Sequence, residues 1–180
     1  MIRIFDFIIS FLLLFFLLPI LISLYFIGLL SNGSPLFKQN RVGYNQKIFL
    51  LVKFRTMKIN TKSVATHLLD TSMITPFGHL LRSSKLDELP QLFNVLLGHM
   101  SLVGPRPCLP NQKRLIIERK KRHIFSVKPG ITGLAQISGI DMKDPILLAK
   151  TDLRMIKNMN LYYYFYYLFK TIIFIMKKKS

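Results

Sequence analysis

The chain begins with a long apolar segment. Residues 7–30 carry no charged side chain, and as a helix rising about 1.5 Å per residue they would be about 36 Å long, enough to cross the hydrocarbon layer. No small-residue cleavage site of the Ala-x-Ala kind follows the segment, so the pattern favours a retained anchor over a removed export signal. We predict a membrane anchor over residues 1–31.

Pro19 lies in the middle of this apolar segment, where it removes one backbone donor and predicts a kink. Two topologies are compatible with a kinked helix: a single pass across the membrane, or a re-entrant hairpin whose two ends stay on one side. Arg3 precedes the segment, whereas Lys38, Arg41 and Lys47 are among the cations that follow it. The positive-inside rule therefore places the body of the protein in the cytoplasm.

A β-hairpin is predicted directly after the anchor. Two extended segments, Pro35–Val42 and Ile48–Met57, flank the turn signal Gly43-Tyr44-Asn45. Lys53 and Arg55 alternate with apolar residues in the second segment, so both cations are expected on the same face of the strand. There they would either bind phosphate or form a solvated strand face.

Helical spacing predicts further elements beyond the hairpin. After a polar loop, Asn60–Thr75, which we expect to act as a mobile flap, three segments have helical patterns: Leu89–Leu97, Asn111–Phe125 and Ile146–Lys157. Pro90 is acceptable only in a first turn, so the first of these helices must begin close to Asp87, which would serve as its N-cap or first-turn acid. The cationic second helix is expected to present a solvated face or to contact lipid headgroups.

The segment Leu161–Met176 is dominated by aromatic residues, since every residue from Tyr162 to Tyr167 is Tyr or Phe. This pattern fits an interfacial helix followed by the basic tail Lys177–Lys179, or an aromatic helix packed on the core of the body. The whole pattern predicts an α+β, mainly helical protein: the anchor, a cytoplasmic catalytic body over residues 32–160, and an aromatic helix with a basic tail over residues 161–180.

Composition narrows the class of protein. Hydrophobic residues make up 51% of the 180 residues, yet the formal net charge is +18, which argues against both an ordinary soluble protein and a disordered basic tail. Together these properties indicate an anionic lipid surface as a partner. A non-catalytic basic module that binds anionic lipid or nucleic acid is one alternative, and the anchor makes nucleic acid the weaker version. A single cysteine, Cys108, excludes an internal disulfide.

The adjacent carboxylates Asp87 and Glu88 carry the candidate chemistry. The chain has 8 acidic residues against 26 Lys and Arg, and this acidic pair lies between Arg82, Lys85 and, further on, Arg106. An ionised aspartate at a helix start is a competent nucleophile toward phosphorus. Both carboxylates are also suitable ligands for a hard cation such as Mg²⁺ bridging a diphosphate.

Arg106 stands between Pro105 and Pro107, which restrict its backbone and favour preorganised, bidentate phosphate binding. The simpler alternative is that Asp87 only caps a helix, Glu88 complements the helix dipole, and Arg106 is a solvated residue in a tight turn.

Four motifs, in order along the chain, resemble those of a known family. They are Lys53–Met57 (KFRTM), Leu86–Val95 (LDELPQLFNV), Gly104–Pro107 (GPRP) and Lys128–Gln136 (KPGITGLAQ). Together they resemble the bacterial sugar transferase family, the monotopic polyprenyl-phosphate phosphoglycosyl transferases. The resemblance extends from the anchor to about Leu168.

This resemblance implies a re-entrant anchor and a small catalytic body on the cytoplasmic face of the bacterial inner membrane. It also implies transfer of a sugar 1-phosphate from a UDP-sugar to undecaprenyl phosphate, with UMP released, as the first step of a membrane-linked glycan that downstream glycosyltransferases extend. Asp87 would attack the β-phosphorus to form a phosphosugar intermediate, with Glu88 as its catalytic partner and Mg²⁺ as cofactor. Lys53, Arg55, Arg82 and Arg106 would bind substrate phosphate, and no nucleic acid partner is expected. A variant mechanism would use the acid pair for direct transfer.

The chain departs from the common family pattern at three places. Leu18-Pro19 stands where Ser-Pro is usual, Gly98-His99-Met100 where Gly-Asp-Met is frequent, and Ser138-Gly139-Ile140 where many members have Asn-Gly-Arg. The last departure removes an arginine, so the family's nucleotide or sugar contacts at Ile140 are not carried over to this chain.

Overall fold

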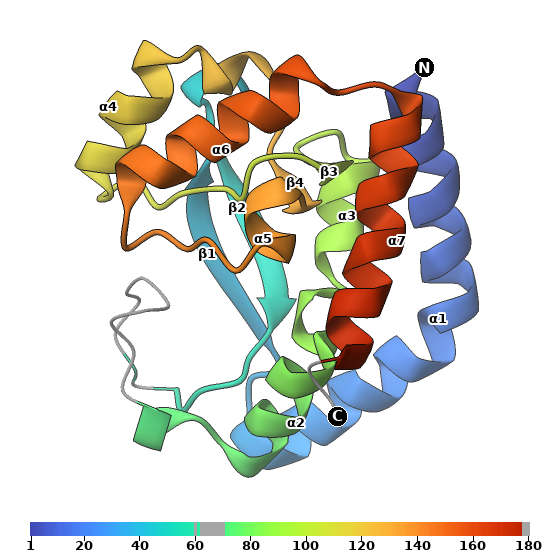
Figure 1. Cartoon of the computed structure of the whole chain (residues 1–180). Coiled ribbons are helices and arrows are strands. Elements are labelled where there is room, and N and C mark those ends of the chain that lie inside the picture. The colour runs from blue at the N-terminus through green and yellow to red at the C-terminus, as the bar shows by residue number, and fades with distance from the viewer. Residues whose placement is uncertain (60, 62–70, 178–180) are drawn as a thin grey trace.

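The computed structural model describes residues 1–59, 61 and 71–177, and it confirms an α+β, mainly helical fold (Figure 1). Its helices and strands are α1 (Ile2–Asn32), β1 (Leu36–Val42), β2 (Ile48–Phe54), α2 (Pro76–Ser84), α3 (Gln91–Leu96), β3 (Ser101–Val103), α4 (Lys113–Lys121), β4 (Gly130–Thr132), α5 (Leu134–Ile137), α6 (Pro145–Lys157) and α7 (Leu161–Lys177). The predicted flap falls largely on residues 60 and 62–70, which lie outside the described residues.

The predicted hairpin is confirmed: β1 and β2 pair antiparallel, from Leu36 opposite Phe54 to Val42 opposite Ile48. The other edge of β2 is held by a side chain of α3. The Asn94 amide oxygen accepts a hydrogen bond from the Val52 N–H at 3.1 Å, and its nitrogen donates to the Leu50 carbonyl at 2.8 Å. Asn94 thereby satisfies the edge of the strand as a neighbouring strand would, and it fixes the hairpin against α3.

A second, shorter sheet brings two of the sequence motifs together. β3 and β4 pair in parallel, with Ser101 opposite Gly130 and Val103 opposite Thr132. Immediately after β3 the backbone of Gly104 passes so close to Gly130 that a Cβ on Gly130 would collide with it. This close approach requires glycine, and it places the GPRP motif directly beside the KPGITG loop.

The core joins the hairpin to the helices around it. The side chains of Leu81, Val95, Met100, Met155 and Tyr164 are almost completely buried. They come from α2, α3, the residue before β3, α6 and α7, and they belong to one hydrophobic cluster. Burial of this cluster holds the short active-site segments between larger elements.

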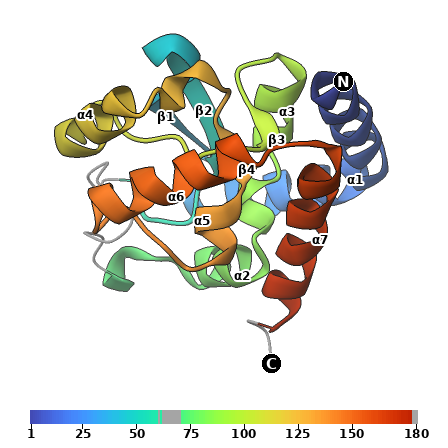
Figure 2. The ribbon, with the colours of Figure 1, turned by 45° about the horizontal axis from the view of Figure 1, so that its top comes forward.

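The apolar helix α1 is continuous but bent, as Pro19 predicts. Its N-terminal part lies beside α7, and its C-terminal part turns away to lie beneath α2 (Figures 1 and 2). The Ser23 hydroxyl donates to the Pro19 carbonyl at 2.9 Å, a side-chain bond that often accompanies helix bending. By length and composition α1 is able to cross a membrane, and only 22% of its most apolar window is buried inside the protein.

Both ends of α1 lie against the same body. Near the N-terminus, the Arg3 guanidinium donates to the carbonyls of Val95 and Leu96 at the end of α3. At the other end, Gly33 adopts a left-handed conformation (φ 67°), and β1 begins three residues later at Leu36. Both ends of α1 are thus tied to the same folded body.

Asp6 strengthens the attachment of α1 to the body. One of its carboxylate oxygens accepts hydrogen bonds from the Ser101 hydroxyl at 3.0 Å, the Leu102 N–H at 2.9 Å and the Tyr164 hydroxyl at 2.9 Å. Asp6 is buried, and it ties α1 to β3 and α7 at a single point. The buried Asp6 oxygen is thus satisfied within the protein.

The aromatic helix α7 packs on the body through one face only. Tyr164 and Tyr167 are buried, whereas Tyr162 and Phe169 are exposed. The core-packing alternative therefore holds for the inner face, while the outer face keeps the apolar and aromatic character expected of a membrane-interface helix. Of the predicted basic tail, only Lys177 lies within the described residues.

Candidate active site

The Asp87–Glu88 pair lies in a 3₁₀ turn, Leu86–Glu88, that connects α2 to α3. The prediction that Asp87 begins or caps the following helix is wrong, because α3 begins at Gln91 with Pro90 as its N-cap residue. Pro90 has no N–H, so the helical hydrogen-bond ladder does not continue back through it. Lys85 enters the turn with φ 60°, a left-handed conformation that is uncommon for a side-chain-bearing residue and is found often at functional sites.

Asp87 is more buried than its sequence context indicates. Its exposed fraction is 6%, and its Oδ1 oxygen has no hydrogen-bond partner among the described residues. Burial raises the pKa of Asp87 to about 6, with Glu88 acting in the same direction and Lys53, Lys85 and Arg82 opposing. The nearby cations lower this pKa but do not cancel the effect of burial, and the carboxylate remains mainly ionised at pH 7.

Glu88 faces the proline-framed arginine. Arg106 Nη2 donates to Glu88 Oε1 at 3.2 Å, and Lys85 Nζ lies 4.0 Å from the same oxygen. Burial alone would raise the pKa of Glu88, but the cations of Arg106, Lys85 and Lys53 outweigh it and hold that pKa below its usual value. The two neighbouring carboxylates thus differ: Glu88 is firmly ionised, while Asp87 is desolvated and closer to neutrality.

Lys53 and Arg82 also face Asp87. Burial lowers the pKa of Lys53 to about 8, although Asp87 opposes that shift. Arg82 Nε donates to the Thr56 hydroxyl at 2.8 Å, and Asp87 raises the pKa of Arg82 against the larger, lowering effect of burial. The structure therefore gathers Lys53, Arg82 and Arg106 around the acid pair.

Arg55 is oriented differently from Lys53, although both side chains contact the same ring. Its Nε donates to the Ser34 carbonyl at 3.1 Å, and one terminal nitrogen lies 3.4 Å from the Leu36 carbonyl. The Lys53 ammonium and the Arg55 guanidinium lie 5.4 Å and 5.5 Å from the centroid of Phe37. The two cations share a strand face as predicted, but the hydrogen bonds of Arg55 go to the junction between α1 and β1 instead of the acid pair.

Sequence reasoning missed Arg41, which belongs to the same face of the hairpin as Lys53. Its Nη1 donates to the Pro107 carbonyl at 3.0 Å, and its Nη2 donates to the Gln39 amide oxygen at 2.6 Å. Burial and then Arg106 lower the pKa of Arg41 to about 10, with Glu88 opposing. Alternation along β1 could have identified Arg41. The side chains of Arg41 and Phe37 leave the strand on the same face, and Phe37 pairs with Lys53.

A buried ion pair supports Arg106 from behind. Arg119 of α4 donates through Nε and Nη2 to Asp152 Oδ2 of α6 at 3.0 and 2.7 Å. Its third nitrogen, Nη1, donates to the Arg106 carbonyl at 2.8 Å. The GPRP loop is thus held by α4 and α6, two helices that the sequence motifs did not connect to the site.

The acid pair has the donor set of a shared cation site. The described residues contain no group of three or more His, Cys, Asp or Glu able to enclose a metal ion. Two adjacent carboxylates with one unpartnered oxygen, Asp87 Oδ1, instead fit Mg²⁺ that also takes ligands from substrate phosphates and water. A magnesium–diphosphate substrate therefore matches these residues better than a metal enclosed by the protein alone.

Comparison with known proteins gives one consistent family. The chain is 38% identical over 170 residues to an uncharacterized sugar transferase of Haemophilus influenzae, covering 85% of this chain and 36% of the relative. It is 36% identical over 182 residues to a UDP-galactose-lipid carrier transferase of Erwinia amylovora (90% and 37% covered). It is 34% identical over 186 residues to an undecaprenyl-phosphate galactose phosphotransferase of Salmonella typhimurium (94% and 39% covered).

The chain therefore spans less than two fifths of the length of each of these three relatives. The family profile, in contrast, is matched almost from end to end, over residues 1–178. The chain belongs to the bacterial sugar transferase family.

Proposed function

We propose that this protein transfers a sugar 1-phosphate from a UDP-sugar to undecaprenyl phosphate and releases UMP. The observation that carries the proposal is the acid pair Asp87–Glu88, surrounded by the cations Lys53, Arg82, Lys85 and Arg106 in a body that is joined to an exposed apolar helix. Relatives named as galactose or glucose phosphotransferases acting on undecaprenyl phosphate agree with it. Such a site suits two anionic substrates, one of them delivered by a membrane.

The reaction proceeds in two steps through Asp87. Its carboxylate oxygen forms a bond to the β-phosphorus of the UDP-sugar, and the bond from that phosphorus to the bridging oxygen breaks, so UMP leaves. A phosphate oxygen of the lipid then attacks the same phosphorus, which restores the Asp87 carboxylate and yields the lipid-linked sugar diphosphate. Lys53, Arg82 and Arg106 neutralise charge on the phosphoryl oxygens in both steps.

Mg²⁺, when bound, neutralises diphosphate charge and so permits two anions to approach each other. Asp87 and Glu88 are the residues that would hold it. Glu88, whose pKa is held low by Arg106 and the neighbouring cations, is ionised for this role throughout the physiological range. Arg106 in turn keeps Glu88 oriented.

We further propose that the protein sits on the cytoplasmic face of the bacterial inner membrane with α1 re-entrant. The contacts of Arg3 and Asp6 with the body support this topology. The exposed apolar side chains of α1 and the outer face of α7 would enter the lipid. The lipid-linked product would pass to downstream glycosyltransferases.

The first experiment measures UMP release from a panel of UDP-sugars with undecaprenyl phosphate, for wild type, Asp87→Asn and the exposed control Asp141→Asn. We expect Asp87→Asn to lose at least about 10³-fold in kcat, because it removes the nucleophile. Near wild-type turnover in Asp87→Asn would overturn the assignment. Without lipid, wild type should retain a radiolabelled sugar phosphate on the protein, and turnover without a trapped label would favour direct transfer.

The second experiment tests topology. A cysteine introduced near Arg3 should be labelled only from the cytoplasmic side, and the buried Cys108 should stay unlabelled in the folded protein. Labelling from the periplasmic side would establish a single-pass anchor.

A further inference from the structure

The loop Gly104–Cys108, which carries Arg106, is held at every carbonyl. Each of its backbone carbonyls accepts a hydrogen bond from a residue outside the loop. The donors, in loop order, are Gln136 Nε2 (3.3 Å), the Gly130 N–H (2.9 Å), Arg119 Nη1 (2.8 Å), Arg41 Nη1 (3.0 Å) and the Val42 N–H (2.9 Å). Pro105 and Pro107 have no N–H, so backbone hydrogen bonds can hold these two residues only through their carbonyls.

Two of these donors are guanidinium groups, and they hold the loop from different elements. Arg119 of α4 donates to the Arg106 carbonyl, and Arg41 of β1 donates to the next carbonyl, that of Pro107. Arg119 is paired with Asp152, which neutralises its charge. Arg41 forms no ion pair with a carboxylate among the described residues, so its positive charge stays within the site.

Arg41 is fixed between the strand and the loop. It leaves β1 on the same face as Gln39, whose amide oxygen accepts a hydrogen bond from Arg41 Nη2 at 2.6 Å, while Nη1 reaches the Pro107 carbonyl. The third nitrogen, Nε, is buried and has no hydrogen-bond partner among the described residues. A guanidinium engaged in this way is placed to act through the loop that it holds.

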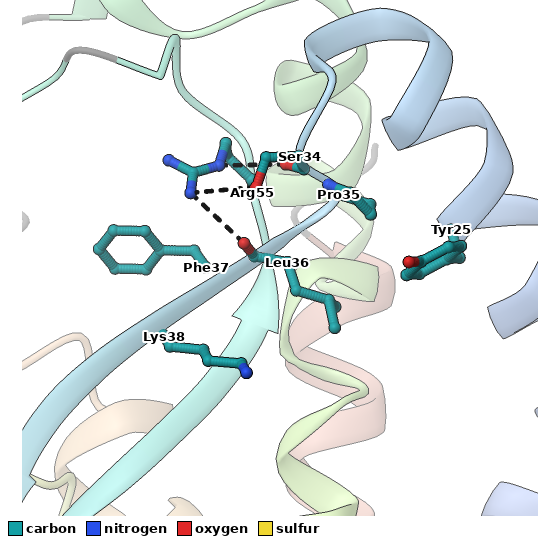
Figure 3. Close-up of a pocket in the computed structure, with 7 residues that line it drawn as sticks. All are labelled: Tyr25, Ser34, Pro35, Leu36, Phe37, Lys38 and Arg55. Carbon is teal, nitrogen blue, oxygen red and sulfur yellow. Dashed lines mark hydrogen bonds between the residues drawn. The ribbon is translucent and has the colours of Figure 1, made fainter.

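Arg55, on the same face of the hairpin, is held at a different place. Its guanidinium donates to the Ser34 carbonyl at 3.1 Å and lies 3.4 Å from the Leu36 carbonyl (Figure 3). It lines a pocket of about 440 Å³ where α1 meets the hairpin. Arg55 therefore ties the hairpin to the end of α1, whereas Arg41 ties it to the loop that carries Arg106.

The position of Arg41 is electrostatically unfavourable. Burial lowers the pKa of Arg41 to about 10, Arg106 adds to that shift, and Cys108 and Glu88 oppose it. Burial and the neighbouring arginine thus both penalise the charged form of Arg41 in the folded protein. Packing alone would be served better by an apolar side chain, which indicates that the charged residue has a role in the site.

We propose that Arg41 is a positioning residue for Arg106. By holding Pro107 it keeps the loop where the Arg106 guanidinium reaches Glu88 at 3.2 Å and can meet the substrate phosphate. The inference rests on the proposed function and adds to it a hairpin residue outside the motifs that resemble the family. A donor preorganised for a transition state loses much of its effect when it shifts by about 1 Å, so a bond to the neighbouring carbonyl affects the rate.

The kinetic test is a double-mutant cycle of Arg41→Met and Arg106→Met, with UMP release as the readout. Arg41→Met alone should lower kcat about tenfold, and kcat/KM for the UDP-sugar should fall in parallel, because a misplaced Arg106 weakens the transition state more than the substrate complex. In the Arg106→Met background the same change should alter kcat less than about twofold. A further tenfold loss in that background would overturn the proposal, because Arg41 would then act independently of Arg106.

Lys47→Met is the matched control. Lys47 is exposed, lies at the turn of the same hairpin and carries the same charge, so its replacement should change kcat by less than about twofold. Arg41→Lys keeps a cation and a donor near Pro107 and should recover part of the loss.

A second measurement follows the loop itself and needs no substrate. Cys108 is the single cysteine of the chain and is buried directly after Pro107. Arg41→Met should make thiol labelling of Cys108 up to about tenfold faster, the effect of one lost hydrogen bond on a local opening, while Lys47→Met should leave the rate unchanged.

Chemical denaturation of the same samples separates local opening from global unfolding. Faster labelling that is fully matched by a loss in the free energy of unfolding would show a general structural role and overturn the positioning role. Should Arg41→Met not fold, Arg41→Lys carries both measurements, with smaller effects of the same sign.

The two proposals fail separately. Absence of UMP release by wild type with every UDP-sugar of the panel would sink the proposed function, while labelling of Cys108 would still show whether Arg41 holds the loop. An active wild type with an unchanged kcat in Arg41→Met would sink the positioning role alone.

Discussion

Two arginine–carboxylate pairs lie on either side of one loop and have opposite characters. Arg119 and Asp152 have side chains that are 2% and 0% exposed and meet at 2.7 Å. Arg106 and Glu88 meet at 3.2 Å, with side chains that are 38% and 15% exposed. The first pair is closed to solvent, whereas the second has an arginine that remains accessible to another anion.

The charge that surrounds each pair differs as well. Arg119 donates through its third nitrogen to the Arg106 backbone, and its pair with Asp152 is neutral, although Asp152 Oδ1, like Asp87 Oδ1, has no hydrogen-bond partner among the described residues. Asp87 and Glu88 instead lie among an excess of positive charge, which comes from Lys53, Arg82, Lys85, Arg41 and Arg106. A neutral pair that is closed to solvent builds structure, while an excess of cations around a partly accessible acid pair prepares a site for anionic substrates.

Among the variants that test this comparison, Asp152→Asn is expected to have the largest effect, a loss of stability. Removing one charge of a buried pair leaves Arg119 uncompensated, and we expect a loss of about 3–5 kcal/mol in the free energy of unfolding. Chemical denaturation of the purified protein measures it. Labelling of Cys108, which is buried and whose thiol pKa is raised by burial, should become faster as unfolding becomes more frequent. A stability equal to wild type would contradict the structural role of the pair.

The second effect is catalytic. Arg106→Met should reduce kcat about 10²-fold, because it removes a preorganised donor at the reacting phosphate. The free energy of unfolding should change far less than in Asp152→Asn, since the Arg106 side chain is partly exposed. Steady-state UMP release and denaturation of the same sample measure the two quantities. A large stability loss with little change in kcat would show that the Arg106–Glu88 pair is structural and not catalytic.

The third prediction concerns pH. The Asp87 carboxylate, with a pKa of about 6, gains a proton as pH falls, and Lys53, with a pKa of about 8, loses one as pH rises. Activity should therefore be bell-shaped with a maximum near pH 7 and fall about tenfold one unit beyond each pKa. Burial is the largest cause of both shifts, with Glu88 adding to that of Asp87 and Asp87 opposing that of Lys53. Lys53→Arg should remove the alkaline limb and keep the acid limb, and a profile without either limb would refute the assignment.

The smallest effect is expected from Asp141→Asn, which carries the same chemical change as Asp152→Asn at an exposed site. Asp141 lies 3.9 Å from Lys143, with side chains that are 54% and 69% exposed. We expect a change below about 0.5 kcal/mol in the free energy of unfolding and less than twofold in kcat. A larger loss would show that exposure does not separate structural from dispensable pairs in this protein.

The elements with strong local patterns were predictable from sequence. The hairpin follows from alternation and its turn residues, α6 from helical spacing, α7 from its run of aromatic residues, and the bend in α1 from Pro19. The contact between Glu88 and Arg106 was anticipated as a shared site, because the prolines around Arg106 and the motif order both indicated it.

Features that depend on tertiary packing were not predictable. Arg119 and Asp152 are 33 residues apart and meet only because α4 packs on α6, and neither segment carries a motif. The raised pKa of Asp87 was not predictable because neighbours in sequence reveal charge, whereas desolvation depends on what covers the side chain. Strand alternation in the sequence places Arg41 on the same face of β1 as Phe37, but only the register of the hairpin shows that Lys53 lies on that face too.

The attachment of Asp6 has a consequence for the order in which the chain matures. The partners of this carboxyl group lie in β3 and, 158 residues away, at Tyr164. During synthesis α1 precedes β3 and α7, so the Asp6 side chain must await both elements before all of its hydrogen bonds can form. Complete docking of the apolar helix therefore occurs late, after most of the body has been synthesised. Removing residues 1–31 to obtain a water-soluble enzyme would leave the Leu102 N–H and the Tyr164 hydroxyl without their acceptor.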